Sequence, residues 1–216
     1  MSESSTRQDL ILVGGGGHCR SCIDVIESDG TFAISGIIDL PEKCGNTILG
    51  YPIIGSDDDI ARVLPESRMA LVTIGQTRDS ALRRRVFEDL LQCGARLPVV
   101  SAATAYRSKH SVIARGTILM HRVVVGPDSR IGENTIVNTG ASIDHGAVVG
   151  SHCHISTGAC INGDCRVGDN VLVGSNATLM QGIVVVSDTI VGAASVVVRS
   201  LTDPGIYVGN PARRIR

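Results

Sequence analysis

The fold is decided by a stretch whose centre, residues 131–155, reads IGENTIVNTGASIDHGAVVGSHCHI. An aliphatic residue recurs there at every sixth position, and this spacing holds without an insertion from Ile113 to Val197. A second register lies two residues before each aliphatic and is nearly all small, as at Ala141, Ala147 and Cys153. Because residues i and i+2 of a strand share a face, both registers should point into one core.

This period is the hexapeptide signature of a parallel β-helix, in which each hexad contributes a short strand and a corner. Three hexads make one triangular coil, so the fifteen hexads of this run predict five stacked coils. Glycine often follows the aliphatic, as at Gly126 and Gly150, and we expect these corners to need a backbone conformation that a side chain would obstruct. Aromatic residues make up only 2% of the chain, which suits a core of small and branched side chains.

The repeat fills only the C-terminal half, so the first 98 residues need a separate explanation. Hydrophobic periodicity there predicts alternating strands and helices. The predicted elements are strands at Leu10–Val13, Phe32–Ile38 and Met69–Ile74, a helix ending before Gly30 and a helix at Leu82–Cys93. We therefore predict an α/β, Rossmann-like domain at residues 1–98, followed at 99–216 by an all-β parallel β-helix domain with a closing segment.

Ligands of parallel sheets bind at the carboxyl ends of the strands. The candidate ligand residues at this edge are Gly16, Gly17, His18, Asp39 and Gly75. Glycines at a helix N-terminus let backbone N–H groups approach a phosphate, and a carboxylate at a strand end suits a sugar hydroxyl. The dinucleotide fingerprint G-x-G-x-x-G is broken by Cys19, which disfavours an NAD enzyme. A nucleotide or nucleotide-sugar site is the interpretation, and the alternative is a tight structural turn beside an ordinary aspartate.

Charge and cysteine usage exclude several classes of partner. The formal net charge of −1 offers no broad footprint for nucleic acid or an anionic membrane. The first apolar run, Leu10–Val13, is too short for a signal sequence or a membrane span, so we expect a cytoplasmic protein. Cys153 and Cys165 fall on the inward register and should only pack. Cys19 and Cys22 form a C-x-x-C, but no second pair exists for zinc, so redox or metal use is disfavoured.

Four histidines of the repeat lie outside the inward registers and should be available to solvent, a ligand or another subunit. They are His121, His145, His152 and His154. Asn138, Asp144 and His145 bring polar groups onto consecutive corners, where the imidazole could act as a general base near neutral pH. A zinc site shared between subunits, as in gamma-type carbonic anhydrases, fits less well because those histidines are spaced differently. We therefore predict no metal.

Several motifs are spread over the whole chain: Gly14–His18, Asp39, the loop Ile48–Gly55, the Asn138-Thr-Gly and Asp144-His145 hexads, and the closing Gly209–Arg213. Together they resemble the sialic acid O-acetyltransferase and bacterial amino-sugar N-acetyltransferase family. The resemblance implies a left-handed β-helix, a homotrimer, and acetyl-coenzyme A bound in the groove between adjacent prisms. It also implies an acceptor that is either sialic acid or the 4-amino group of a UDP-linked amino-deoxy sugar.

The resemblance also implies roles for single residues. His145 corresponds to the base that deprotonates the acceptor, and Asp144 and Asn138 complete the candidate catalytic set. The implied coenzyme residues are His154, Gly163, Gly174, Ser175, Ala193, Pro211 and Arg213, and the acceptor residues are those of the N-terminal cleft. Relatives commonly carry Glu or Asp directly after the catalytic histidine, whereas Gly146 stands here. Asp144 or a residue of another subunit would then have to orient the imidazole.

These observations together predict an acetyl-CoA-dependent acetyltransferase that N-acetylates a UDP-linked amino sugar by direct transfer. The nucleotide cleft favours this acceptor over sialic acid, whose O-acetylation is the first alternative. The second alternative is a non-catalytic nucleotide-sugar-binding scaffold, which the absent carboxylate after His145 would suit. No covalent acyl-enzyme is expected, because Cys153 faces the core.

Overall fold

The computed structural model describes residues 7–67, 69–76 and 80–216, and the chain divides into two compact units. The first unit runs up to Gly75 and resumes at Arg85–Pro98. The second comprises Gln76–Arg84 and Val99–Arg216. The short segment Gln76–Arg84 thus groups with the repeat, although nothing in its sequence marks it as part of the solenoid.

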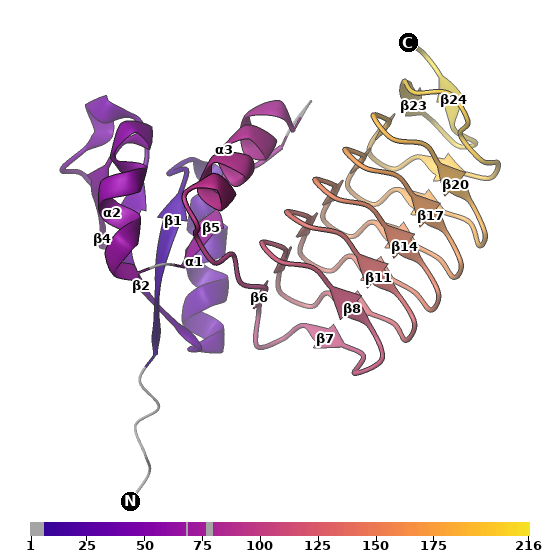
Figure 1. Cartoon of the computed structure of the whole chain (residues 1–216). Helices are drawn as coiled ribbons and strands as arrows, with labels where there is room; N and C mark the ends of the chain where they lie inside the picture. Colours follow the sequence, from indigo (N-terminus) through magenta and orange to yellow (C-terminus); the bar gives the residue numbers. More distant parts are fainter. Residues whose placement is uncertain (1–6, 68, 77–79) are drawn as a thin grey trace, which may run out of the picture. The chain divides into compact units, whose positions relative to one another are not determined.

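The first unit is built on a five-stranded sheet with strand order β3-β4-β2-β1-β5 (Figure 1). Its strands are β1 (Gln8–Val13), β2 (Phe32–Ile38), β3 (Thr47–Ile48), β4 (Tyr51–Gly55) and β5 (Ala70–Val72), and the helices of this part of the chain are α1 (Gly17–Asp29), α2 (Ile60–Ser67) and α3 (Ala81–Gln92). β1 pairs in parallel with β2 and β5, and β2 pairs in parallel with β4. The predicted α/β class is confirmed, and β2 has the bounds that the sequence predicts.

Two elements of this unit were not predicted. β3 and β4 form an antiparallel hairpin where a loop was expected. α2 follows it and buries Ile60 and Leu64 against Phe87 and Leu90 of α3. Both elements are short, and each contains a proline, Pro52 in β4 and Pro65 in α2, so neither is long enough or regular enough in sequence to be recognised. Burial against the rest of the unit supports α2 in the fold.

The second unit is a triangular prism of two-residue strands (Figure 1). The strands are β6 (Val100–Ser101), β7 (Tyr106–Arg107), β8 (Val112–Ile113), β9 (Ile118–Leu119), β10 (Val124–Val125), β11 (Arg130–Ile131), β12 (Ile136–Val137), β13 (Ser142–Ile143), β14 (Val148–Val149), β15 (His154–Ile155), β16 (Cys160–Ile161), β17 (Arg166–Val167), β18 (Leu172–Val173), β19 (Thr178–Leu179), β20 (Val184–Val185), β21 (Ile190–Val191), β22 (Val196–Val197), β23 (Ile206–Val208) and β24 (Arg213–Arg214). From β6 to β19, each strand pairs in parallel with the strand one coil further on, as Ile143 pairs with Ile161.

The prism has three faces, and each is named by the number of strands that it contains. The eight-stranded face contains β6, β9, β12, β15, β18, β21, β23 and β24; the six-stranded face β7, β10, β13, β16, β19 and β22; and the five-stranded face β8, β11, β14, β17 and β20. Both predicted registers point inward, since Ala141, Ile143, Ala147 and Cys153 are fully buried. The repeat starts earlier than predicted, because Ser101 and Arg107 take the aliphatic position in β6 and β7. The end of the solenoid encloses less core and does not require an aliphatic there.

The expected conformation of the corner glycines is wrong. Glycines directly after the aliphatic, such as Gly126 and Gly132, do not have positive φ. A Cβ at Gly132 would instead lie 2.5 Å from backbone atoms of the next coil, so these glycines allow close stacking. The left-handed residue is the third after the aliphatic, and the residues at this position are Gly116, Arg122, Asp128, Asn134, Gly140, Gly146, His152, Gly158, Asp164, Asn170, Asn176, Gly182, Asp188 and Ala194. Gly, Asn and Asp dominate because they tolerate this conformation best.

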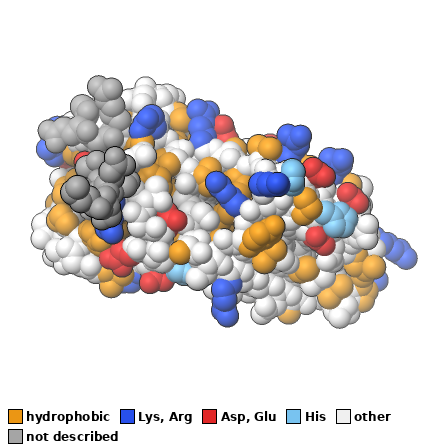
Figure 2. Space-filling view, turned by 90° about the horizontal axis from the view of Figure 1, so that it is seen from below, with side chains coloured by type: hydrophobic (Ala, Val, Ile, Leu, Met, Phe, Trp, Pro, Cys, Tyr) orange, Lys and Arg blue, Asp and Glu red, His pale blue; other side chains and the backbone are white. Residues whose placement is uncertain are grey.

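Charged side chains of both signs are interspersed on the face seen in Figure 2, in keeping with the small net charge. Within the described ranges, no helix has the length and apolar character required to cross a membrane.

Candidate active site

His145 lies on the corner between the six-stranded and the five-stranded face. Its side chain is exposed, and its backbone is held on three sides. The Asp144 carboxylate accepts the His145 backbone N–H at 2.7 Å, the Asp164 N–H donates to the His145 carbonyl at 3.0 Å, and Gly146 N–H donates to Pro127. The candidate Asp144 therefore binds the backbone of the corner rather than the imidazole. An exposed imidazole on a fixed backbone is suited to proton transfer with a bound substrate.

Gly146 has φ +65°, so this corner needs a residue that accepts the left-handed conformation. A Cβ added here would lie 2.4 Å from Oδ1 of Asp164. The carboxylate of Asp164 thus occupies the space in which a side chain at position 146 would begin. Because aspartate holds the same left-handed position at Asp128 and Asp188, the neighbouring carboxylate of Asp164, and not the backbone conformation, is the local reason why no acid follows His145.

Asn138 and His154 form a second polar group around another part of the prism. Asn138 lies on the corner between the eight-stranded and the six-stranded face, and His154 is in β15 of the eight-stranded face. The Asn138 amide nitrogen lies 3.2 Å from Nε2 of His154, and the backbone carbonyl of Gln76 lies 3.0 Å from Nδ1. A carbonyl only accepts, so Nδ1 carries the proton and Nε2 accepts from Asn138.

The expected availability of His154 to solvent is wrong, because only 9% of this residue is exposed. Burial lowers the pKa of His154 to about 4, and the nearby positive charge of Arg83 acts in the same direction, while the hydrogen bond to Gln76 opposes them. His154 is therefore a neutral hydrogen-bonding group near neutral pH. Its predicted role beside the coenzyme stays a prediction.

Ser80 and Arg83, which precede the repeat in sequence, are joined to the prism by buried polar contacts. Ser80 hydrogen-bonds the Asn170 side chain, and Arg83 donates to the backbone carbonyl of Asn134. Ser80 and Arg83 are each only 1% exposed. Sequence reasoning missed these residues and Gln76, since a backbone carbonyl carries no sequence signal and Arg83 reads as one of several charges on a helix.

The predicted coenzyme residues fall into three places. Gly174, Ser175 and Ala193 lie on the same corner as Asn138, whereas Gly163 lies on the corner of His145. Pro211 and Arg213 are exposed near the C-terminal end of the unit. Within one chain, the candidate base and most of the candidate coenzyme residues are thus on different corners, separated by the six-stranded face.

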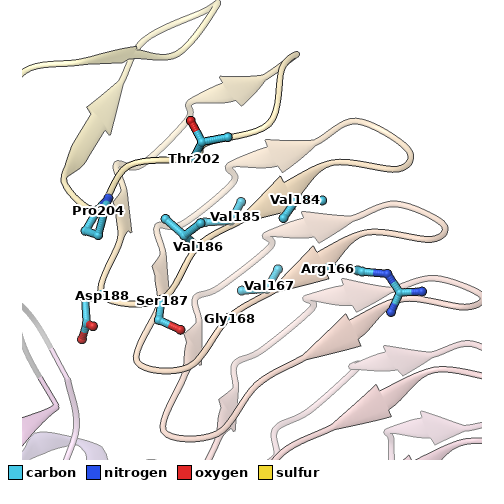
Figure 3. A pocket seen from close by; sticks show the side chains of 10 residues that line it. All are labelled: Arg166, Val167, Gly168, Val184, Val185, Val186, Ser187, Asp188, Thr202 and Pro204. Atoms are coloured by element: carbon cyan, nitrogen blue, oxygen red, sulfur yellow. The ribbon is translucent and has the colours of Figure 1, made fainter.

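A cavity of about 550 Å³ opens on the five-stranded face near the C-terminal end of the prism. Figure 3 shows its lining side chains, including Val184, Val186, Ser187, Asp188 and Pro204. None of the predicted catalytic or coenzyme residues is among its lining residues. This cavity therefore adds no support for their assignment.

In the first unit, the predicted acceptor residues gather at the carboxyl ends of the strands. A Cβ at Gly15 would lie 2.5 Å from the Asp39 carboxylate, and one at Gly75 would lie 3.2 Å from Cβ of His18. Asp39 is paired with Lys43 at 2.8 Å, so its charge is already partly balanced. The edge of the sheet therefore brings the glycine loop, Asp39 and Gly75 together, as the order of the elements predicts.

The reason for glycine differs from one position of this loop to the next. Gly14 has φ +107°, and Gly15 is required by the close approach of Asp39. Gly16 and Gly17, at the start of α1, have neither a positive φ nor any atom within 4 Å of an added Cβ. Their lack of side chains leaves the helix N-terminus open, as backbone binding of a phosphate requires.

The cysteines on which the sequence analysis made predictions, Cys19, Cys22, Cys153 and Cys165, are all buried. Cys19 and Cys22 of the C-x-x-C are fully buried, and burial raises the pKa of the Cys19 thiol. Burial also raises the pKa of Cys153 to about 12, so this thiol is not a nucleophile near neutral pH. Among the residues with described positions, no three His, Cys, Asp or Glu side chains are grouped to hold a metal ion.

Comparison with known proteins supplies the class. Residues 9–90 match the PglD N-terminal domain, and residues 146–181 match the bacterial transferase hexapeptide (six repeats). The chain therefore contains both of these domains, as the resemblance to hexapeptide-repeat acyltransferases predicted, and its prism is a left-handed β-helix. An uncharacterized protein of Acanthamoeba polyphaga mimivirus is 45% identical over 215 residues. The matched region covers all of this chain but only 42% of the length of that protein.

Solved structures resemble the chain over nearly its full length. The acetyltransferase domain of PglB from Neisseria gonorrhoeae FA1090, in complex with acetyl coenzyme A, is 29% identical with a TM-score of 0.89, covering 97% of this chain and 100% of that one. A mutant of perosamine N-acetyltransferase from Caulobacter crescentus, in complex with CoA and GDP-perosamine, is 29% identical with a TM-score of 0.90, covering 95% and 96%.

Proposed function

We propose that this protein is an acetyl-CoA-dependent N-acetyltransferase of a nucleotide-linked amino sugar, with His145 as the general base. The observation that carries the proposal is the exposed His145 imidazole on a corner fixed by backbone hydrogen bonds. Support for the donor and the acceptor comes from the similar proteins that bind acetyl coenzyme A, or CoA with GDP-perosamine. The open helix N-terminus at Gly16 and Gly17 suits the diphosphate of such an acceptor.

The chemistry is direct acetyl transfer. His145 removes a proton from the sugar amine as its nitrogen attacks the thioester carbonyl. The C–N bond forms, the C–S bond breaks, and the proton on the imidazole passes to the departing thiolate of coenzyme A. Backbone N–H groups of the coils are the candidate donors for the transient oxyanion. The buried Cys153 takes no part, because its thiol stays protonated.

The division of the candidate residues between two corners supports a site shared by two subunits. A second copy of the prism could bring its Asn138 corner next to the His145 corner of the first, which fits the homotrimer expected from the resemblance. A contact between two different corners is heterologous, and it would repeat in every groove of a closed ring. We propose cyclic assembly, since one chain alone does not unite the two corners.

The acceptor's nucleotide is the least determined feature of the proposal. A UDP-linked 4-amino sugar is our first choice, although the perosamine enzyme named above holds a GDP-linked sugar. Mixing the purified protein with acetyl-CoA and each candidate acceptor, followed by detection of free thiol and of the product mass, decides between them. We expect thiol release with a nucleotide-linked amino sugar and none without an acceptor.

Two other outcomes would overturn the proposal. Release of free thiol only with free sialic acid as acceptor would favour O-acetylation. No release of thiol with any acceptor, together with no rise in melting temperature on addition of acetyl-CoA, would favour a non-catalytic nucleotide-sugar-binding scaffold, because a ligand that binds the folded state must stabilise it.

Gly17→Ala tests the acceptor half of the proposal. The added methyl meets no atom within 4 Å, and alanine favours a helix over glycine by about 1 kcal/mol, so the free energy of unfolding should be unchanged or raised. Nucleotide-sugar affinity, measured by calorimetry, should fall about tenfold through loss of a charge-assisted backbone contact. Gly15→Ala is the matched control, and should destabilise the fold because its methyl would collide with Asp39. Unchanged affinity in Gly17→Ala would contradict phosphate binding at this loop.

A further inference from the structure

Gly163 lies directly against the imidazole of His145. The two residues hold the same position in successive coils, since β13 pairs with β16 and each residue follows its strand by two places. A Cβ at Gly163 would lie 2.4 Å from Cε1, 2.6 Å from Nε2 and 3.0 Å from Nδ1 of His145. These are the three nearest atoms, and all belong to the ring. The imidazole thus occupies the space that a side chain at position 163 would fill, and Gly163 is buried beneath it.

The backbone at Gly163 gives no other reason for glycine. Its φ is not positive, and the residue of this corner that adopts the left-handed conformation is Asp164, with φ +59°. Other prism glycines, such as Gly132 and Gly168, are required by backbone atoms of the next coil. At Gly163 the nearest obstacle is instead a functional side chain of the preceding coil.

Packing is also the main restraint on the ring within one chain. The Asp144 carboxylate accepts the backbone N–H of His145 and not a ring nitrogen. In the part of the chain that the structure describes, neither ring nitrogen of His145 forms a hydrogen bond. The contact with Gly163 therefore sets how far the imidazole can lie over the next coil.

We infer that Gly163 is a positioning residue for the His145 imidazole, a role that rests on the proposed function of His145. A methyl group at position 163 would need the ring to move by about 1 Å to reach ordinary contact distance. Misplacement by 1 Å can reduce turnover about 100-fold. The role differs from a coenzyme contact, which would act on the acetyl-CoA affinity whether or not the imidazole is present.

Gly163→Ala, made in the wild type and in a His145→Ala background, tests the inference. In the wild type we expect kcat to fall about 10- to 100-fold, with the KM for acetyl-CoA within about twofold. In the His145→Ala background, the same change should cost nothing further, because there is no ring to displace. Gln181→Ala, which alters the same position one coil further on, is the matched control and should keep wild-type kcat.

Three results would overturn the positioning role: wild-type kcat in Gly163→Ala, an equal loss in both backgrounds, or a rise in KM with kcat unchanged. The NMR signal of the His145 ring Cε1–H, assigned by its absence in His145→Ala, gives a readout independent of catalysis. We expect this signal to shift in Gly163→Ala, and an unmoved signal would refute the inference. If His145→Ala itself retains wild-type turnover, the proposed function of His145 fails, while the ring signal still decides whether Gly163 sets its position.

Discussion

The corner that carries His145 and the face that carries His154 have opposite environments, although the two residues are nine positions apart in one repeat. His145 is exposed and its ring has no hydrogen bond within the described chain. His154 is buried, and both of its ring nitrogens are hydrogen-bonded, to Gln76 and Asn138. The difference arises because Gln76, a residue outside the repeat, places its backbone carbonyl against the His154 ring. The repeat determines the direction of a side chain, but what lies over that side chain determines its chemistry.

This contrast divides the two imidazoles between different tasks. Burial holds His154 neutral, so it can orient Asn138 but is a poor proton acceptor near neutral pH. His145 is exposed and held only by packing, as its proposed role as general base requires. The following changes test each side of the comparison.

The largest expected effect is that of His145→Ala. General base catalysis contributes about 10²- to 10⁴-fold, so kcat in the thiol-release assay should fall by that factor. The melting temperature should stay close to that of the wild type, because the side chain is exposed and hydrogen-bonds nothing within the described chain. Wild-type turnover in this variant would remove His145 from the mechanism and end its contrast with His154.

The buried histidine should reveal itself in the pH dependence of stability. The pKa of His154 is about 4 when folded and about 6.5 when unfolded, so the unfolded state binds more protons between these values. The stabilising contribution of neutral His154 is therefore complete above pH 6.5 and is lost as the pH falls towards 4. It should amount to about 3 kcal/mol, measured by urea unfolding at several pH values.

His154→Gln is the control for this measurement, because glutamine keeps hydrogen-bonding groups but does not titrate. The fall in stability between pH 6.5 and 4 should be smaller in this variant by about the same amount. If the free energy of unfolding falls equally with pH in the two proteins, His154 is not buried as a neutral imidazole.

The smallest effect concerns the corner beside His145. Gly146→Ala should lower the free energy of unfolding by about 1–2 kcal/mol, because alanine is strained at φ +65°. Gly146→Asn should cost less, since asparagine already holds the equivalent position at Asn134, Asn170 and Asn176. Thermal or urea unfolding of both variants checks the order. Equal costs would mean that contact with Asp164, rather than backbone conformation, favours glycine here.

Predictability from the sequence differs between the units for a physical reason. In the prism, every strand repeats the same two inward positions, so one pattern predicted the buried cysteines and the outward direction of all four histidines. In the first unit, the longer elements that lack an internal proline were predicted. The β3–β4 hairpin and α2 were not, because both are short and each contains a proline. The candidate residues followed from the resemblance, but the partners of Asp144 and His154 did not.

The sequence by itself determined the prism, its inward registers and the alternation of the longer strands and helices in the first unit, and it placed His145 on an outward corner. Local spacing suffices for these because each strand and corner is defined by residues within one hexad or one element. Only the tertiary structure decided that Gln76 covers His154, that Asp144 binds a backbone N–H, and that His145 lies over Gly163. The contacts of Gln76 and Gly163 join residues one coil or more apart, so stacking and burial in three dimensions create them. The contact of Asp144 joins neighbours in sequence, but it depends on the side-chain direction that the folded corner sets.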